Sequence, residues 1–199
     1  MDNKHTLAAL FAMWVKGERA GAAALAKRLG LRPEEARKEM QGLARAGMVE
    51  LVGGSARLTS KGRRSIRVVF IGGGFELIHY GHVYTISKAR SLGDVLVVSV
   101  ARDSTIRKRK DREPLISEDD RVRLLSSLRE VDAAILGVEG DIYVTLQRVK
   151  PDVVALGYDQ YHMEDDVRRE AKRRGMKLRV VRLDSPYPHL KTTKILKEL

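Results

Sequence analysis

The sequence contains no cysteine and no apolar run near the length of a membrane span, and each absence excludes a class of protein. Without cysteine there is no disulfide framework, no thiolate nucleophile and no cysteine-based zinc site. A spanning helix needs about 20 apolar residues in a row, and residues 1–10 lack the pattern of a secretion signal. We therefore expect a cytoplasmic protein without a membrane partner.

Acidic residues are scarce relative to basic ones. The chain has 26 Asp and Glu against 38 Lys and Arg, a formal net charge of +12. Residues 1–65 hold 13 basic and 6 acidic side chains, and the remaining 134 residues hold 25 and 20, so the first part is the more basic per residue. Such a balance favours polyanionic partners, either nucleic acid or phosphorylated small molecules. A solvated surface rich in lysine and arginine is the alternative.

The first 65 residues have a helical rhythm that ends in a hairpin. Apolar residues three and four positions apart predict a helix from residue 6 to 15. Helices at 22–29 and 33–46 follow; Gly30 ends the first of them, and a proline in the first turn begins the second. The stretch "MVELVGGSARLT" then predicts two short strands joined by a pair of glycines.

This segment, through "LTSKGR", resembles the winged helix-turn-helix family. The resemblance makes 33–46 the recognition helix, places Arg57 on the wing and implies duplex DNA as a partner. The same helix carries three carboxylates, which disfavour phosphate contact unless they face away: Glu34, Glu35 and Glu39. A dimerisation or protein-docking module is the alternative.

From residue 66 the rhythm changes to short apolar strands that alternate with amphipathic helices. The predicted strands are 66–71, 95–101, 133–136, 153–156 and 178–183. The predicted helices are 82–92, 118–130, 142–149, 163–174 and 192–199. This alternation is typical of a parallel sheet with helices on both faces. We predict an α/β fold, with a Rossmann-like doubly wound sheet at 66–199 after a small winged-helix domain at 1–65.

The stretch "GGGFELIHYGH", residues 72–82, forms the first strand-to-helix loop. Ligands bind beyond the carboxyl ends of parallel strands, where backbone N–H groups and a helix N-terminus attract phosphate. The glycines fit neither the Walker A nor the dinucleotide-binding spacing. His79 and His82 flank Gly81, which leaves room for a nucleotide, and both imidazoles can donate to phosphate. A zinc pair is the alternative, with His162 or His189 recruited as a further ligand.

These residues resemble the nucleotidyltransferase superfamily with an HxGH signature, and its cytidylyltransferase-like branch, over 66–199. "GGFELIHYGH" stands where the branch has Gly-Thr-Phe-Asp-x-x-His-x-Gly-His, and "KTTKIL" resembles its C-terminal element. Within the branch, "VARD…RKRK", "LGYDQ" and "TKI" are most similar to archaeal FAD synthetases. Glycerol-3-phosphate cytidylyltransferases share the same skeleton.

The resemblance implies a role for each matching residue. The catalytic set is His79, His82, Lys108 and Lys110. The nucleotide would be bound by Gly73, Gly74, Phe75, His79, His82, Arg121, Gly157, Asp159, Thr192, Thr193 and Lys194. The acceptor would be bound by Glu76, Asp103, Lys108 and Tyr158. Gly74 and Glu76 depart from the family's threonine and aspartate, which leaves the acceptor open.

The implied reaction transfers AMP from ATP to FMN with Mg²⁺ and releases pyrophosphate. A CTP-dependent transfer to glycerol 3-phosphate, or a similar phosphorylated alcohol, is the first alternative. A winged-helix regulator that senses flavin or nucleotide is the second. A homodimer is expected from the resemblance alone.

Overall fold

The computed structural model describes residues 3–160, 162–190 and 192–195, without the side chains of Thr193 and Lys194. The chain divides into two compact units, Met1–Arg67 and Val68–Leu199. None of the helices in these described ranges combines the length and the apolar character that a membrane crossing requires.

The N-terminal unit contains three helices, a hairpin and a short fourth helix. Its elements are α1 (Asn3–Lys16), α2 (Ala22–Leu29), α3 (Pro33–Arg45), β1 (Val49–Val52), β2 (Ser55–Leu58) and α4 (Ser60–Arg64). β1 and β2 pair antiparallel, and Gly21 bridges to Ser55 at the hairpin edge. The predicted order of helices and hairpin is confirmed, and Arg57 does lie on β2.

Local sequence explains the turns of this unit. Gly30 ends α2 in the left-handed conformation with φ of 66°, which a residue without Cβ adopts at no steric cost. Pro33 begins α3, where its missing N–H would have no helical partner. Leu10, Leu25 and Leu43, one from each main helix, are buried in the shared core.

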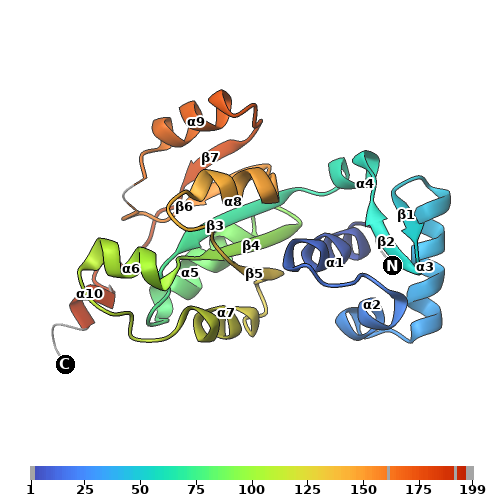
Figure 1. Ribbon diagram of the computed structural model, residues 1–199, viewed down its shortest axis with the longest axis horizontal. Coiled ribbons are helices and arrows are strands. Elements are labelled where there is room, and N and C mark those ends of the chain that lie inside the picture. Colours follow the sequence, from blue (N-terminus) through green and yellow to red (C-terminus); the bar gives the residue numbers. More distant parts are fainter. Residues whose placement is uncertain (1–2, 161, 191, 196–199) are drawn as a thin grey trace. The chain divides into compact units, whose positions relative to one another are not determined.

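The C-terminal unit is built on a five-stranded sheet in the order β5-β4-β3-β6-β7, and every pair is parallel (Figure 1). The strands are β3 (Val68–Gly73), β4 (Val95–Val100), β5 (Ala133–Leu136), β6 (Val153–Leu156) and β7 (Arg179–Arg182). The helices are α5 (Tyr80–Arg90), α6 (Asp103–Lys110), α7 (Glu118–Ser126), α8 (Ile142–Val149), α9 (Glu164–Arg173) and α10 (Thr192–Ile195).

Strand order reverses at β3, so the sheet is doubly wound. The chain moves outward from β3 through β4 to β5, then returns past β3 to β6 and β7. Because parallel crossovers are right-handed, this reversal puts the two sets of helices on opposite faces. Figure 1 shows α5 and α7 on one face and α8 and α9 on the other. The predicted fold class is confirmed, and the carboxyl ends of β3 and β6 meet at the switch point where ligands bind.

Several elements differ from the sequence prediction. The strand predicted at 66–71 runs two residues later, as β3, and the helix predicted at 118–130 ends earlier, as α7. No element was predicted at the positions of α4 and α6. α6 has one buried side chain, Ile106, so it lacks the apolar periodicity on which a sequence prediction depends. Asp103 in its first turn and four basic residues in its last turn complement the helix dipole.

Candidate active site

The loop after β3 is shaped around Phe75. This residue has φ of 51°, a left-handed conformation that is uncommon outside glycine. A Cβ on Gly73 would lie 2.9 Å from the Phe75 ring, so Gly73 provides the space that the ring fills. The ring centroids of Phe75 and His82 lie 5.5 Å apart. The loop therefore presses a buried aromatic ring against one of the two signature histidines.

The two histidines form a stacked pair at the start of α5. His79 is the residue that precedes α5, and His82 lies in the first turn. Their ring centroids are 3.9 Å apart. The Nδ1 atoms of both rings are buried and have no hydrogen-bond partner in the described part of the chain. Buried polar atoms are normally paired, so this pair is suited to a ligand that supplies the partner.

Burial, with smaller contributions from the neighbouring His79 and from Lys110, lowers the pKa of His82 to about 4, although Asp159 acts in the opposite direction. Burial also lowers the pKa of His79, again opposed by Asp159. Both rings are consequently neutral near pH 7. An anionic phosphate would raise both pKa values, because an adjacent negative charge favours the protonated ring. The pair can thus gain positive charge as phosphate charge develops beside it.

Gly81 has a different role from the one predicted. A Cβ at this position would lie 3.1 Å from Cε1 and Nδ1 of His79. The space that the sequence suggested for a nucleotide is therefore filled by the imidazole of His79. Gly81 allows that ring to fold back over the helix start.

Glu76 meets two cations of its own chain. Its side chain is 1% exposed and accepts hydrogen bonds from Lys110 and Arg112, with Arg112 Nη1 at 2.7 Å from Oε1. Burial alone would raise the pKa of Glu76, but the bonds from Arg112 and Lys110 hold it below the ordinary value. The predicted contact between Glu76 and the acceptor has no support here, because both carboxylate oxygens are already engaged.

The structure separates the two predicted lysines. Side chains two positions apart on a helix do not share a face, so Lys108 and Lys110 point to different sides of α6. Both lysines are exposed, but Lys110 reaches the Glu76 carboxylate. Arg112, which follows the helix, joins Lys110 instead. The sequence signal for Arg112 was its place two residues beyond the basic run.

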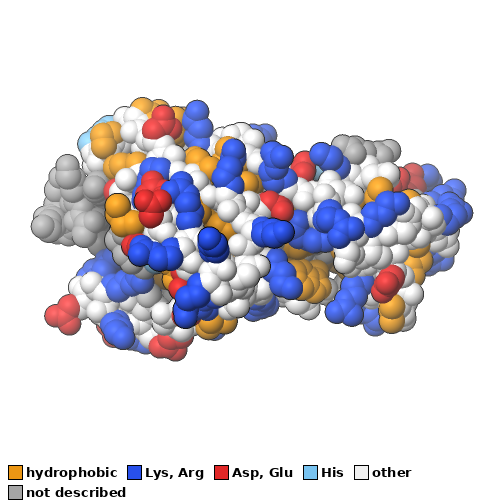
Figure 2. Space-filling model, turned by 90° about the horizontal axis from the view of Figure 1, so that it is seen from above, with side chains coloured by type: hydrophobic (Ala, Val, Ile, Leu, Met, Phe, Trp, Pro, Cys, Tyr) orange, Lys and Arg blue, Asp and Glu red, His pale blue; other side chains and the backbone are white. Residues whose placement is uncertain are grey.

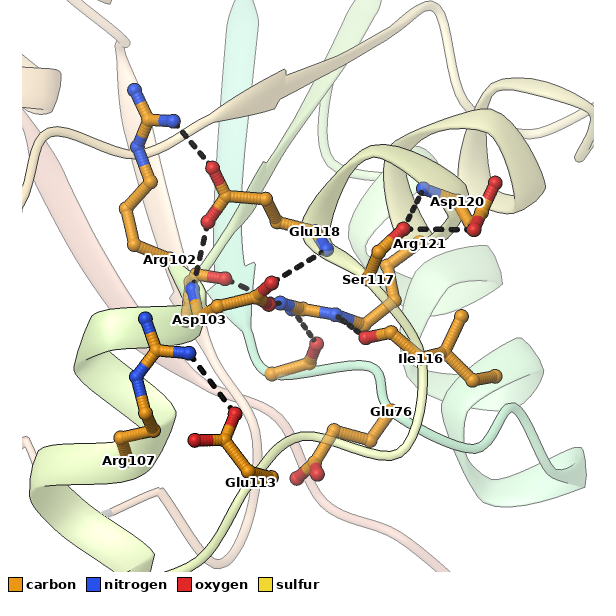
Figure 3. A network of polar contacts seen from close by, with 12 residues as sticks. Glu76, Arg102, Asp103, Arg107, Glu113, Ile116, Ser117, Glu118, Asp120 and Arg121 are labelled. Carbon is orange, nitrogen blue, oxygen red and sulfur yellow. Dashed lines mark hydrogen bonds and ion pairs between the residues drawn. The ribbon is translucent and has the colours of Figure 1, made fainter.

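Arg121 is fully buried and cross-links three backbone segments (Figure 3). Its Nε donates to the Ile116 carbonyl at 3.0 Å, and its Nη1 donates to the carbonyls of Gly74 at 2.6 Å and Ala101 at 2.9 Å. Its Nη2 donates to Asp103 at 2.5 Å. With these donors used, Arg121 does not reach a nucleotide as predicted. It holds the glycine loop against the end of β4.

Asp103 belongs to the same network. One carboxylate oxygen accepts from Arg121, and the other accepts from the backbone N–H of Glu118 at 3.3 Å. Its own N–H donates to the Glu118 carboxylate at 2.7 Å. The predicted acceptor contact of Asp103 therefore competes with bonds that join α6 to α7.

A polar hollow of about 420 Å³ opens beside Asp103. It is lined by Arg102, Asp103, Ser104, Arg107, Glu118 and Glu139. Its lining includes neither signature histidine and is rich in charge, so it suits a polar group better than an aromatic ring.

A second arginine shapes the loop after β6. Arg182 donates to the carbonyls of Gly157 at 2.8 Å, Gln160 at 3.0 Å and His162 at 2.6 Å. It also pairs with Glu164. The sequence predicted no role for Arg182, because an arginine at the end of an outer strand has no distinctive sequence signal.

This loop is brought to the histidines. The side chain of Gln160 donates to the Gly72 carbonyl, which joins the loop to the end of β3. Asp159 acts electrostatically on both imidazoles. The Tyr158 hydroxyl donates to the Pro188 carbonyl at 3.1 Å. Of the predicted residues on this loop, Asp159 therefore acts on the histidine pair. Gly157 instead accepts a hydrogen bond from Arg182, and Tyr158 donates one to Pro188.

The C-terminal segment closes the site from a third direction. The Thr192 hydroxyl donates to the Leu77 carbonyl at 3.4 Å, beside the histidine loop. Tyr187 packs edge-on against Tyr80 at 4.9 Å and Tyr84 at 5.6 Å between centroids. The predicted side chains of Thr193 and Lys194 lie outside the described residues.

Among the described residues, no group of three His, Asp or Glu side chains is arranged to bind a metal ion. A third ligand for zinc at the histidine pair, from His162 or His189, is therefore not found among those residues. A hard cation such as Mg²⁺ needs fewer protein ligands when phosphate oxygens supply the rest.

A doubly wound sheet with two stacked imidazoles at its switch point, and a basic helix after the neighbouring strand β4, defines a phosphate-handling α/β enzyme. The family described as Cytidylyltransferase-like matches residues 70–198, and the chain belongs to this family. It is 43% identical to the FAD synthase of Pyrococcus horikoshii over 139 residues, which cover 68% of this chain and 93% of that one. It is 44% identical to the FAD synthase of Methanothermus fervidus over 132 residues, or 64% and 90% of the two chains.

A solved structure extends the likeness to three dimensions. The lipopolysaccharide core biosynthesis protein of Thermoplasma volcanium is 40% identical, with a TM-score of 0.59. The match covers 60% of this chain and 98% of that chain.

We expect Gly81→Ala to lower turnover by about 10-fold to 100-fold, because the added methyl group displaces His79 and small displacements of a catalytic group are costly. Gly42→Ala, on α3, is the matched control. A Cβ there meets no atom within 4 Å, and we expect turnover to change less than about 2-fold. Steady-state pyrophosphate release by both variants checks this. Equal rates for the two variants would contradict the role of Gly81.

Proposed function

We propose that this chain is an FMN adenylyltransferase, an FAD synthase that transfers AMP from ATP to FMN and releases pyrophosphate. The observation that carries the proposal is the stacked His79–His82 pair at the switch point of the sheet, whose two Nδ1 atoms have no partner among the described residues. The identity to archaeal FAD synthases over most of their length supports FMN as the acceptor.

The chemistry needs no general base from the protein. An oxygen of the FMN phosphate attacks the α-phosphorus of ATP, a new P–O bond forms, and the bond to the β-phosphate breaks. The second pKa of a phosphate monoester is about 6, so the attacking oxygen is already ionised near neutral pH. Alignment and charge neutralisation then carry the catalysis. The histidine pair and the nearby Lys110 and Arg112 match this demand, since they are imidazoles and cations.

In this proposal His79 and His82 donate to the phosphates of ATP. The side chains of Lys110 and Arg112 move from Glu76 to the triphosphate or the acceptor phosphate and neutralise its charge. Their present bonds to that carboxylate keep both cations beside the glycine loop. Gly73, Gly74 and Phe75 shape the phosphate loop, and Asp159 tunes the pair. Thr192, Thr193 and Lys194 bind the outer phosphates.

Mg²⁺ would enter with the nucleotide. Asp159 is the carboxylate that acts on both histidines, so it is the residue placed to meet a cation on the triphosphate. When bound, the ion would neutralise phosphate charge.

The acceptor ring has aromatic surfaces available close to the pair. Tyr80 directly follows His79, is 58% exposed and packs against Tyr187. We propose that Tyr80 and Tyr158 contact the flavin, since aromatic faces stack well on a planar ring. We also propose that 1–65 and 66–199 act as separate domains and that the protein is a homodimer.

The test is pyrophosphate release with Mg²⁺, with ATP or CTP crossed against FMN or glycerol 3-phosphate. We expect release only with ATP and FMN, with FAD formed in equal amount. Release only with CTP would move the chain to the cytidylyltransferases. Flavin or nucleotide binding without any release would favour the sensor instead.

A further inference from the structure

Glu76 is a buried carboxylate that has no contact with substrate in the proposed transfer of AMP. Its side chain is 1% exposed, and it is the one acidic side chain among the fully buried residues of the described ranges. Figure 3 shows its carboxylate directed away from Arg121, the other buried charge, whose ion pair is with Asp103. A buried charge must be paired and hydrogen-bonded, because its removal from water is costly. Glu76 therefore depends on partners that its own chain supplies.

Two side chains supply all the hydrogen bonds of the Glu76 carboxylate within the described part of the chain. Lys110 donates to Oε2, Arg112 Nη1 donates to Oε1 at 2.7 Å, and Arg112 Nη2 donates to Oε2 at 3.2 Å. Arg112 thus holds both carboxylate oxygens through its planar guanidinium. The cluster of these three residues has two positive charges and one negative charge, so it keeps a net positive charge.

The acid and its two partners differ in their access to solvent. Many Lys and Arg side chains lie on the surface that Figure 2 shows, in contact with solvent. The side chains of Lys110 and Arg112 are 36% and 32% exposed, so a dissolved anion can reach them, whereas it cannot reach the buried Glu76. The charge of Lys110 also acts on the His82 ring. A phosphate at the histidine pair therefore lies within the field of this cluster.

Glu76 joins the chain on both sides of the turn that ends α6. This helix buries one side chain, Ile106, and Asp111 ends it in the left-handed conformation with φ of 49°. Lys110 precedes Asp111, Arg112 follows it, and both side chains meet at the Glu76 carboxylate. The positions of the two cations therefore depend on a shared carboxylate more than on apolar packing.

Carboxylate and phosphate present the same kind of acceptor to a guanidinium. Arginine binds either group through two parallel N–H···O bonds, which is how Arg112 binds Glu76. Two oxygens of a phosphate would accept the same bonds. We propose that Glu76 is a positioning residue, which holds Lys110 and Arg112 in place for a substrate phosphate and competes with that phosphate for them. This inference rests on the proposed function, which supplies the phosphate.

The proposal predicts opposite effects on binding and on turnover when the charge of Glu76 is removed. Glu76→Gln keeps the size of the side chain, but a neutral amide pairs weakly with the two cations. Inorganic triphosphate then meets less competition, and we expect its dissociation constant to fall about 5-fold. The kcat of FAD formation should fall about 10-fold, because the cations are no longer held at a fixed place. A purely structural side chain would weaken binding and turnover together.

Isothermal titration calorimetry of the full-length protein with inorganic triphosphate measures binding, and steady-state FAD formation at saturating ATP and FMN measures kcat. Glu76→Asp retains the charge on a shorter side chain. We expect its kcat to stay within about 3-fold of the wild type, and its affinity for triphosphate to lie between those of the wild type and Glu76→Gln. Should Glu76→Gln fail to fold, Glu76→Asp replaces it, and binding no tighter than that of the wild type would overturn the proposal.

Glu113→Gln is the matched control, since it removes the same charge from a nearby carboxylate. Glu113 pairs with Arg107 at 3.0 Å, and its side chain is 74% exposed. Exposed pairs contribute little, so we expect binding and kcat to change less than about 2-fold.

Three results would overturn the proposal: triphosphate binding by Glu76→Gln that is unchanged or weaker, equal effects of Glu76→Gln and Glu113→Gln, or no triphosphate binding by the wild type. A different result would contradict the proposed function alone. If the wild type formed no FAD while Glu76→Gln bound triphosphate more tightly, the transfer of AMP would be excluded and the competition by Glu76 supported.

Discussion

His82→Ala is expected to lower the turnover number by about 10²-fold to 10³-fold, the cost of one lost donor to a developing phosphate charge. The ring of His82 stacks on His79, and its Nδ1 has no partner among the described residues. In the variant, the group that loses a hydrogen-bond donor is therefore the substrate phosphate. Steady-state FAD formation measures the loss. Normal turnover in this variant would contradict the assignment of the pair.

Two controls separate chemistry from folding. His5→Ala removes an exposed imidazole from α1 and should leave turnover unchanged. The thermal midpoint of His82→Ala should stay within a few degrees of the wild type, because no hydrogen bond through the buried Nδ1 is lost. A variant that melts early would require His82→Gln to be measured in its place.

Arg121→Met should produce the largest loss of stability. It removes four hydrogen bonds and leaves Asp103 Oδ1 and the carbonyls of Gly74, Ala101 and Ile116 without this donor. Breaking one side of a buried ion pair costs about 3–5 kcal/mol. Since Asp103 retains some exposure, we expect about 3 kcal/mol in the free energy of unfolding. The change in the free energy of unfolding is measured from the transition of the C-terminal unit in urea denaturation.

Arg123→Met is the matched control for this prediction. Arg123 lies two residues further on the same helix, its side chain is 80% exposed, and among the described residues its ion pair is with Asp120. Exposed pairs contribute up to about 1 kcal/mol, so we expect a change below that. Similar losses in the two variants would contradict the view that Arg121 acts as a buried cross-link.

The sequence predicted the sheet because its strands are apolar throughout. β5 and β6 begin and end as expected, and both are buried, so continuous valine, alanine, isoleucine and leucine were sufficient signals. The glycine pair at Gly53–Gly54 identified the hairpin for the same kind of local reason, since both residues adopt positive φ. The binding role of the histidine loop was predicted from its position after the first strand of the sheet.

The misplaced residues share a different cause. Whether Arg121 faces a ligand or three backbone carbonyls depends on loops that come together only in the fold. The same holds for Glu76, whose partners Lys110 and Arg112 lie 34 and 36 positions away. α6 was missed because a helix with one buried side chain, Ile106, has no apolar face to reveal it. Burial and long-range pairing therefore decided the roles that residue type alone left open.

Position-labelled ATP tests the central claim most directly. The protein is incubated with FMN, Mg²⁺ and ATP that carries radioactive phosphorus at either the α or the γ position, and the products are separated. Attack at the α-phosphorus beside His79 and His82 predicts α-label in FAD and γ-label in pyrophosphate. Transfer of γ-label to the flavin, or α-label that stays in free nucleotide, would contradict adenylyl transfer by this site.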